Sequence, residues 1–291
     1  MFKLPRRFGW LPDYPDLRDY TAENENVLPL VERLGLQKTK KGSLPEKVDL
    51  RKHCSPIENQ GEIGSCTANA AAGIIEYYER KAFEKDIDVS RLFIYKTTRN
   101  LLHLNGDTGA YIRTTIGSLA LFGVPPESYW QYTDKSPDFD KEPPAFCYAF
   151  AQNYQALKYY SLDPSVLDEK EILQNIKVHL ASGIPVIFGF TVYSSLNQAE
   201  NGNIPFPSKG ETVLGGHAVV SAGYDDKKEI INPLSKEKTT GALLIRNSWG
   251  EEWGEKGYGW LPYKYVLKEL AIDFWVLLKM EYLDTDQFGL K

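Results

Sequence analysis

Cys66 carries the strongest chemical signal for a nucleophile in this sequence. It follows Ser65 at the expected start of a helix, whose packed face is marked by apolar residues at helical spacing. Free backbone N–H groups and the helix dipole at such a terminus lower the pKa of a thiol and favour the thiolate. A lone cysteine is more often just a small buried residue, so this interpretation depends on the residues around it.

His217 is the histidine best placed to serve such a thiol. Of the four histidines, it alone stands between a glycine pair, Gly215-Gly216, and a run typical of a strand. Glycines in that position let a backbone approach a site closely. His53, His103 and His179 have no metal-ligand partner at the usual spacing, so we expect surface or packing roles for them and neither a metal nor an organic cofactor.

Motifs for other chemistries are absent from the sequence. It contains no Gly-x-Ser-x-Gly elbow, no phosphate-binding glycine loop, no zinc-binding helix motif and no Cys-x-x-Cys pair. The 34 basic and 39 acidic residues give a net charge of -5, which argues against a nucleic-acid partner. The longest apolar stretch, around Ile184 to Val192, is far shorter than the ~20 residues that cross a bilayer, so we expect no membrane partner.

The two halves of the chain that must position these residues differ in the periodicity of their apolar residues. Amphipathic helical patterns that stop at Gly or Pro dominate the first half, and runs of β-branched and aromatic residues dominate the second. Helices are predicted for about four turns from Cys66 and over residues 90–102, 111–122 and 169–181. Strands are predicted over residues 186–192, 218–224, 242–246 and 258–261. The stretch 193–216 is expected to be a long loop that brings the chain to His217.

Residues 1–43, called the leader below, differ from the rest of the chain. They contain Pro5, Pro12 and Pro15, show little helical periodicity and end in the basic stretch 38–43. We therefore predict an extended leader with an exposed polar linker. The leader lacks the apolar block of a signal peptide, which favours a cytoplasmic protein or export by another route.

Three motifs place a glutamine, a cysteine, a histidine and an asparagine in a fixed order. They are Gln60-Gly61-Glu62-Ile63-Gly64-Ser65-Cys66, Gly215-Gly216-His217-Ala218-Val219, and the Trp- and Gly-rich stretch Asn247–Tyr258. Together with Leu44–Arg51, they resemble the papain-like cysteine peptidases, the family of papain and the cathepsins, from residue 44 to at least residue 261. The short leader and the absence of the usual disulfide pattern resemble bacterial members of this family.

The resemblance implies roles for the polar residues of the motifs. Cys66 would attack the scissile carbonyl as a thiolate paired with protonated His217, which then gives its proton to the leaving amine. Asn247 would orient the imidazole, and Trp249 would shield their hydrogen bond from water. Gln60 would help to bind the developing oxyanion beside the backbone N–H of Cys66.

The same resemblance points to residues that bind the substrate. Gly109 and Ala110 match a glycine-containing wall that pairs with an extended peptide backbone. Gly216 and Trp249 are expected to line the cleft. Asp273 is a candidate for the floor of the main specificity pocket, where a carboxylate would favour a basic residue, but it could equally pair with a nearby cation.

The sequence also departs from the pattern of the family. Thr67 stands where an aromatic residue usually follows the nucleophile, and Ile63 replaces a cysteine, so the usual bridge there cannot form. Whether Cys54 and Cys147 pair is left open by the sequence. The connection between the histidine and the asparagine is lengthened at residues 225–240, which we expect to be a solvated hairpin tip, with a role in restricting the cleft as the alternative.

The fold implied by the resemblance is α+β, with two domains and an active cleft between them. A helical left domain is predicted over residues 44–160, and an antiparallel, β-barrel-like right domain over 161–291. Family members are commonly made as zymogens. We predict that part of residues 1–40 crosses the cleft as an extended inhibitory strand and is removed by cleavage near residues 38–44; the alternative is a permanently attached surface arm.

The expected activity is hydrolysis of peptide bonds in a peptide or protein substrate, with the leader as an intramolecular inhibitor. Two alternatives use the same fold. One is a catalytically weak or inactive module that only binds peptides. The other is an acyltransferase in which an amine, rather than water, takes the acyl group from Cys66.

Overall fold

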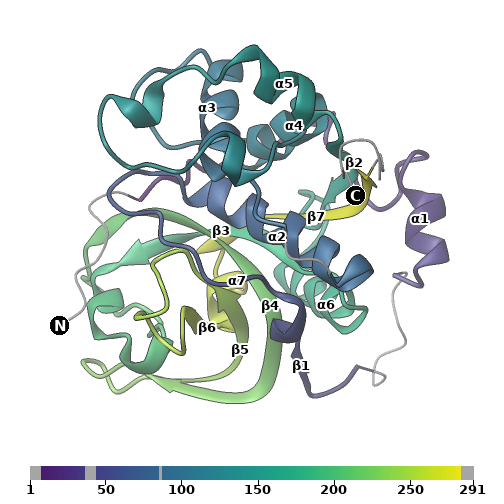
Figure 1. Ribbon diagram of the computed structural model, residues 1–291. Coiled ribbons are helices and arrows are strands. Elements are labelled where there is room, and N and C mark those ends of the chain that lie inside the picture. The colour runs from purple at the N-terminus through teal and green to yellow at the C-terminus, as the bar shows by residue number, and fades with distance from the viewer. Residues whose placement is uncertain (1–7, 37–43, 85–86, 283–291) are drawn as a thin grey trace.

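A long central helix separates a helical layer from a curved antiparallel sheet (Figure 1). The computed structural model describes residues 8–36, 44–84 and 87–282. The central helix is α2 (Cys66–Phe83). The helical layer on top of it contains α3 (Arg91–Leu101), α4 (Ile112–Phe122) and α5 (Ala145–Ala151).

The sheet has seven strands, and all neighbouring strands are antiparallel. Their order is β2-β7-β3-β4-β5-β6, with β1 paired to β4. Within the described residues the sheet does not close into a complete barrel, because β2 and β6 remain its two ends. The strands are β1 (Lys47–Asp49), β2 (Tyr154–Ser161), β3 (Val186–Tyr193), β4 (Val213–Ile231), β5 (Lys238–Arg246), β6 (Tyr258–Pro262) and β7 (Ala271–Tyr282).

Local signals in the sequence set the ends of several helices. Ser90 caps α3 by accepting the backbone N–H of Phe93. Asp168 and Glu171 form a reciprocal capping box at the start of α6 (Glu169–Ala181). Gly123 follows α4 with a φ of 73°, a conformation that ends the helix and favours glycine.

Short elements complete the chain. Two are the helices α1 (Leu28–Arg33) and α7 (Tyr263–Val266). The others are single turns of tighter helix at Arg51–His53, Glu127–Tyr129, Asp138–Asp140, Ser194–Gln198 and Glu200–Gly202.

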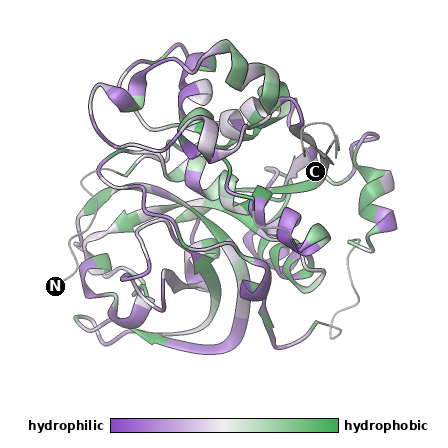
Figure 2. Cartoon of the chain, in the orientation of Figure 1, coloured by the Kyte–Doolittle hydropathy of each residue, from purple (hydrophilic) through white to green (hydrophobic). Residues whose placement is uncertain are grey.

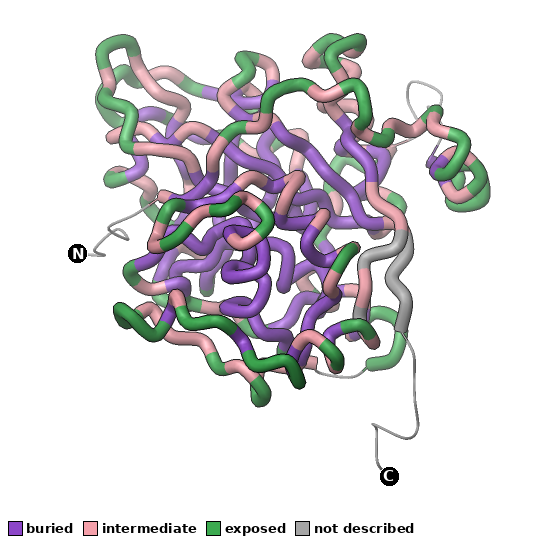
Figure 3. The backbone as a smooth tube through the Cα atoms, turned by 90° about the horizontal axis from the view of Figure 1, so that it is seen from above, coloured by how far each residue is buried: buried purple, intermediate pink, exposed green. Residues whose placement is uncertain are grey.

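Two hydrophobic clusters stabilise the two layers. One is built mainly from the sheet and includes Phe188 and Tyr224, and the other is built mainly from the helices and includes Ile74 and Phe93. Apolar residues follow the central strands and the inner helices in Figure 2, and Figure 3 shows the same segments as the most buried. This arrangement agrees with an α+β fold, while the exact domain limits at residues 43 and 160 stay a prediction.

The strongly periodic elements lie where the sequence predicts them. The four helices predicted from residues 66, 90, 111 and 169 are α2, α3, α4 and α6, and the four predicted strands are the cores of β3 to β6. The lengthened connection at 225–240 is mostly strand, because β4 runs to Ile231 and β5 begins at Lys238, so it extends a hairpin. The start of β4 at Val213 also shortens the predicted loop that ends at residue 216.

The prediction of a leader without helix is wrong at one place, because α1 lies within it. Val27, Val31 and Leu36 are buried in the cluster that the sheet forms. Packing of these three apolar side chains supports a helix that is too short to be stable by itself. The predicted cleavage region near residues 38–44 lies almost entirely outside the described residues.

The structure shows whether the cysteines pair, which the sequence left open. Cys54, Cys66 and Cys147 are all free thiols in the described part of the chain, which includes every cysteine. Among the described residues, no helix is long and apolar enough to cross a membrane. The same residues contain no group of three or more His, Cys, Asp or Glu side chains that could hold a metal ion.

Candidate active site

Cys66 is the first residue of α2 and is fully buried. The backbone N–H groups of Ala218, Gly9 and the first turn of its own helix lie near the sulfur and favour its thiolate form. Burial raises the pKa of the thiol to about 11, although the N–H groups oppose this shift. In this enclosed state the thiol is therefore protonated at neutral pH.

His217, in β4, donates a hydrogen bond from Nε2 to Oδ1 of Asn247 at 2.8 Å. The same Oδ1 accepts the backbone N–H of Ser248 at 2.8 Å, so it must act as acceptor and the imidazole nitrogen as donor. The neutral ring therefore keeps its lone pair on Nδ1, which is buried and has no hydrogen-bond partner among the described residues. Burial lowers the pKa of His217 to about 4, and the bond to Asn247 opposes this change.

Three aromatic rings surround the imidazole, one of them the ring of Phe190 at a centroid distance of 5.8 Å. Trp249 stacks on His217 with ring centroids 4.5 Å apart and an interplanar angle of 26°. Phe8, from the leader, lies edge-on to both rings at centroid distances of 6.1 Å. These rings exclude water, which explains why burial is the largest cause of the shifted pKa of His217.

Gln60 is fully buried, and Ser248 fixes the orientation of its side chain. The Ser248 hydroxyl donates to Oε1 of Gln60 at 2.6 Å, while Nε2 of Gln60 donates to the carbonyl of Ile63 at 3.0 Å. An amide nitrogen carries two hydrogens, so one N–H remains for a ligand. Ser248 thus holds two amide side chains at once: Gln60 through its hydroxyl and Asn247 through its backbone N–H.

The leader crosses the site in an extended conformation. The carbonyl of Gly9 accepts the N–H of Ala110 at 2.8 Å, and the N–H of Leu11 donates to the carbonyl of Ala110 at 3.0 Å. On the opposite side, the N–H of Trp10 donates to the carbonyl of Gly216 at 3.0 Å. The leader is therefore held by backbone hydrogen bonds between the two sides of the cleft.

Glycines let the leader approach the nucleophile closely. A Cβ atom at Gly9 would lie only 1.8 Å from the carbonyl oxygen of Gly64, two residues before Cys66. A Cβ atom at Gly109 would lie 2.3 Å from the carbonyl oxygen of Gly9, and Gly109 has a φ of 75°. Both glycines are therefore required by close backbone packing.

Trp10 fills a pocket beside the nucleophile. Added Cβ atoms at Gly189 and Gly216 would lie 2.0 Å and 2.6 Å from its ring, so only glycines leave room for the indole. Its Nε1 donates to Oδ2 of Asp273 at 3.0 Å, and the same oxygen accepts the N–H of Asp13 at 2.9 Å. Asp273 therefore lies at the end of the pocket that the indole occupies.

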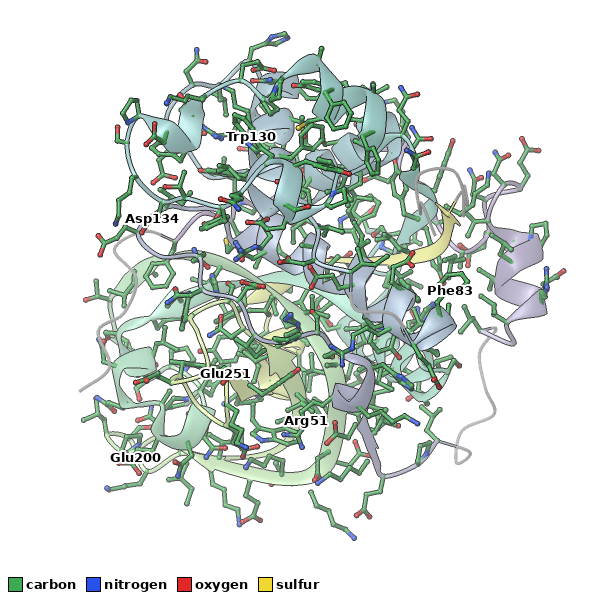
Figure 4. The ribbon with its side chains drawn as sticks, viewed as in Figure 1. Arg51, Phe83, Trp130, Asp134, Glu200 and Glu251 are labelled. Carbon is green, nitrogen blue, oxygen red and sulfur yellow. The ribbon has the colours of Figure 1, made fainter. Side chains whose placement is uncertain are left out.

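Charged side chains hold segments at the edges of the site. Arg113, at the start of α4, binds the leader through Asp13 at 3.1 Å and Asp19 at 2.5 Å. Asp134 accepts the N–H of Glu62 at 3.1 Å and so supports the turn before the nucleophile. Figure 4 shows Asp134 at the boundary between the helical layer and the sheet.

The structure brings the residues that the sequence singles out into one region. They are Cys66, His217, Asn247, Gln60, Trp249, Gly109, Ala110, Gly216 and Asp273. Thr67, the residue after the nucleophile, is buried. Two residues of the site, Ser248 and Trp10, are not predicted by the sequence motifs. Ser248 stands between two residues to which roles were assigned. The sequence signal for Trp10 is only that an aromatic residue follows a glycine in a Pro-rich leader.

Comparisons with known proteins show the family of this chain. Residues 44–269 match the family model described as papain family cysteine protease. The chain belongs to the papain family of cysteine peptidases. It is 33% identical over 289 residues to an uncharacterized peptidase C1-like protein of Acanthamoeba polyphaga mimivirus, which covers 94% of this chain and 87% of that protein.

Two further papain-family relatives have names that describe them as proteases. The crystal structure of xylellain, a cysteine protease from Xylella fastidiosa, superposes with a TM-score of 0.72 at 35% identity and covers 95% of this chain and 98% of that one. The thiol protease aleurain of Arabidopsis thaliana is 28% identical over 77% of this chain and 57% of its own length. This chain is thus a cysteine-type peptidase with the α+β papain fold.

Proposed function

We propose that this peptidase hydrolyses peptide bonds with Cys66 as nucleophile and His217 as proton acceptor, and that the docked leader keeps it latent. The free lone pair on Nδ1 of His217 carries this proposal. Asn247 occupies Nε2, so the neutral imidazole can accept a proton only on Nδ1. The thiol that would supply this proton lies near the backbone N–H of Ala218, the residue next to His217.

The reaction would proceed in two halves. In the first, the Cys66 proton moves to Nδ1 of His217 and the thiolate attacks the carbonyl carbon, so that the oxygen becomes an oxyanion. The backbone N–H of Cys66 and the remaining N–H of Gln60 Nε2 stabilise this charge. The C–N bond then breaks as His217 protonates the leaving amine, which leaves a thioester. In the second half, His217 takes a proton from water, hydroxide adds to the thioester, and the acid leaves as Cys66 regains its proton.

The leader is expected to suppress this reaction electrostatically as well as sterically. With the leader docked, burial raises the pKa of Cys66 and lowers that of His217, so both groups are neutral near pH 7. Departure of Phe8 and Gly9 would admit water, which relieves the desolvation of both charged forms. The thiolate and imidazolium would then stabilise each other.

The orientation of the leader supports inhibition rather than cleavage at Gly9. The carbonyl of Gly9 is directed to the N–H of Ala110, from which it accepts a hydrogen bond at 2.8 Å. A scissile carbonyl must instead direct its oxygen to the N–H donors of Cys66 and Gln60. The leader therefore fills the cleft in a pose that the nucleophile cannot attack productively.

The pocket that holds Trp10 suggests what a substrate side chain would meet. Once the indole leaves, Asp273 would lose the hydrogen-bond donor that it now has in the glycine-lined pocket. We expect this carboxylate to favour a side chain with a donor at its tip, such as arginine or lysine. Peptides that differ only by Arg or Leu at this position should be separated by kcat/KM, and Asp273→Asn should reduce the difference.

An epoxysuccinyl thiol reagent, followed by peptide mapping, tests the central assignment. We expect the label on Cys66 of the full-length protein, a faster reaction once the leader is displaced, and no label in Cys66→Ser. Peptide turnover should be lost in Cys66→Ala. Turnover that persists in Cys66→Ala would refute the mechanism, and products carrying an added amine would indicate acyl transfer instead of hydrolysis.

A further inference from the structure

Two side chains outside the catalytic motifs connect the segments on either side of Gly9. The carboxylate of Asp107 accepts the N–H of Gly64 at 2.8 Å through Oδ1 and the hydroxyl of Tyr95 at 2.6 Å through the same oxygen. The Tyr95 hydroxyl in turn accepts the N–H of Gly109 at 3.1 Å. A continuous chain of hydrogen bonds therefore runs from the turn before the nucleophile to the glycine wall.

These two backbone segments are the ones that confine the leader beside Cys66. An added Cβ at Gly64 would lie 3.0 Å from Cα of Gly9 and 3.6 Å from Cα of Gly109, so the three glycines are packed together. Any peptide backbone that replaces the leader has to enter the same narrow space. The separation of Gly64 and Gly109 thus controls how a substrate can lie against the nucleophile.

The Tyr95–Asp107 pair is itself held rigidly. Tyr95 is fully buried in α3, and the guanidinium of Arg99, one turn later, lies 4.0 Å from the centre of its ring. Arg99 also donates to the carbonyl of Gly106 at 2.5 Å and binds Asp140 at 2.6 Å. Because all three cysteines of the chain are free, no disulfide joins the two segments.

We propose that Tyr95 and Asp107 are positioning residues that set the width of the cleft for the backbone of a peptide substrate. This inference rests on the proposed function, because the segments that the pair connects flank the nucleophile. A loosened wall would place the scissile carbonyl poorly with respect to Cys66 without changing the thiol itself. The expected defect is therefore confined to reactants that must pair with the wall.

Two reagents distinguish poor positioning of a peptide from a general loss of Cys66 reactivity. Iodoacetamide alkylates Cys66 without any peptide backbone, whereas a peptidyl epoxysuccinate has to lie along the wall. In full-length protein carrying Gly9→Ala to displace the leader, Tyr95→Phe should lower the peptidyl reagent's rate and kcat/KM about tenfold. The iodoacetamide rate should not change.

Matched variants sharpen the test. Asp107→Asn retains an acceptor oxygen and should keep more activity than Asp107→Ala. Tyr148→Phe removes a hydroxyl that donates to Glu142 in the same layer, and it should behave as the unsubstituted chain. Equal losses with both reagents, or equal rates in Tyr95→Phe and Tyr148→Phe, would overturn the inference.

Hydrogen exchange tests the same pair independently of activity. In the chain with its native leader, Tyr95→Phe should speed amide exchange in residues 61–66, which the hydroxyl reaches only through Asp107. Exchange there equal to that of Tyr148→Phe would refute the pair. A Cys66 that proved unreactive would count against the proposed mechanism alone, since the exchange measurement does not depend on it.

Discussion

A single methyl group at Gly9 is predicted to convert the latent protein into an open one. Gly9 does not have a left-handed φ, so alanine is compatible with its backbone conformation. The new Cβ would nevertheless lie 1.8 Å, 2.3 Å and 2.5 Å from the O, C and Cα atoms of Gly64. These are backbone atoms, and the N–H of Gly64 is fixed by Asp107, so a small shift cannot relieve the overlap.

The size of the effect follows from the cost of overpacking. Insertion of a methylene group into a well-packed region costs about 1–3 kcal/mol, and contact with backbone on the opposite side belongs at the upper end. A loss of about 3 kcal/mol from docking would raise the population of the open cleft by about 100-fold. Cys66 should therefore react about 100-fold faster in Gly9→Ala than in the unsubstituted chain.

The assay is the second-order rate of Cys66 labelling by an epoxysuccinyl reagent in the full-length protein at fixed pH. Leu17→Ala is the matched control, because Leu17 lies in the leader and its side chain is fully exposed. It should label at the original rate. If Gly9→Ala also labels at that rate with its fold intact, the docked leader does not limit access to the nucleophile, and the argument for latency fails.

Two further outcomes are expected from the geometry of the site. Asn247→Ala in the opened protein should lower kcat/KM by about 100-fold, because His217 loses the hydrogen-bond acceptor that fixes its ring. The melting temperature should change little. An unchanged kcat/KM would show that Asn247 has no role in the mechanism. Docking of the leader should weaken as pH rises from about 4 to about 7. Burial raises the pKa of Asp273 from 3.8 to about 7 and that of Asp13 to about 6, and these two groups outweigh His217, whose pKa burial lowers to about 4. The docked state therefore binds more protons than the open state in this range. Limited proteolysis of the leader in a Cys66→Ala protein should follow this pH dependence, and Asp273→Asn should flatten it; greater cleavage at acid pH would show that the sign is wrong.

Local sequence patterns determined a large part of this structure. The start of α2 at Cys66 follows from the apolar periodicity of its own residues, and α6 begins at the capping box of Asp168 and Glu171. The residue types and order of the three motifs were enough to assign the family. These features depend on neighbours within a few residues, which a sequence displays directly.

Other features were decided only by tertiary structure. Trp10 and Asp273 are 263 residues apart in sequence, and the contact between them depends on the path of the leader across the sheet. The helix α1 forms because Val27 and Val31 find a buried surface, and the role of Tyr95 emerges only when Asp107 and Gly109 fold back onto α3. Each depends on long-range packing, which leaves no period in the sequence because its partners come from distant parts of the chain.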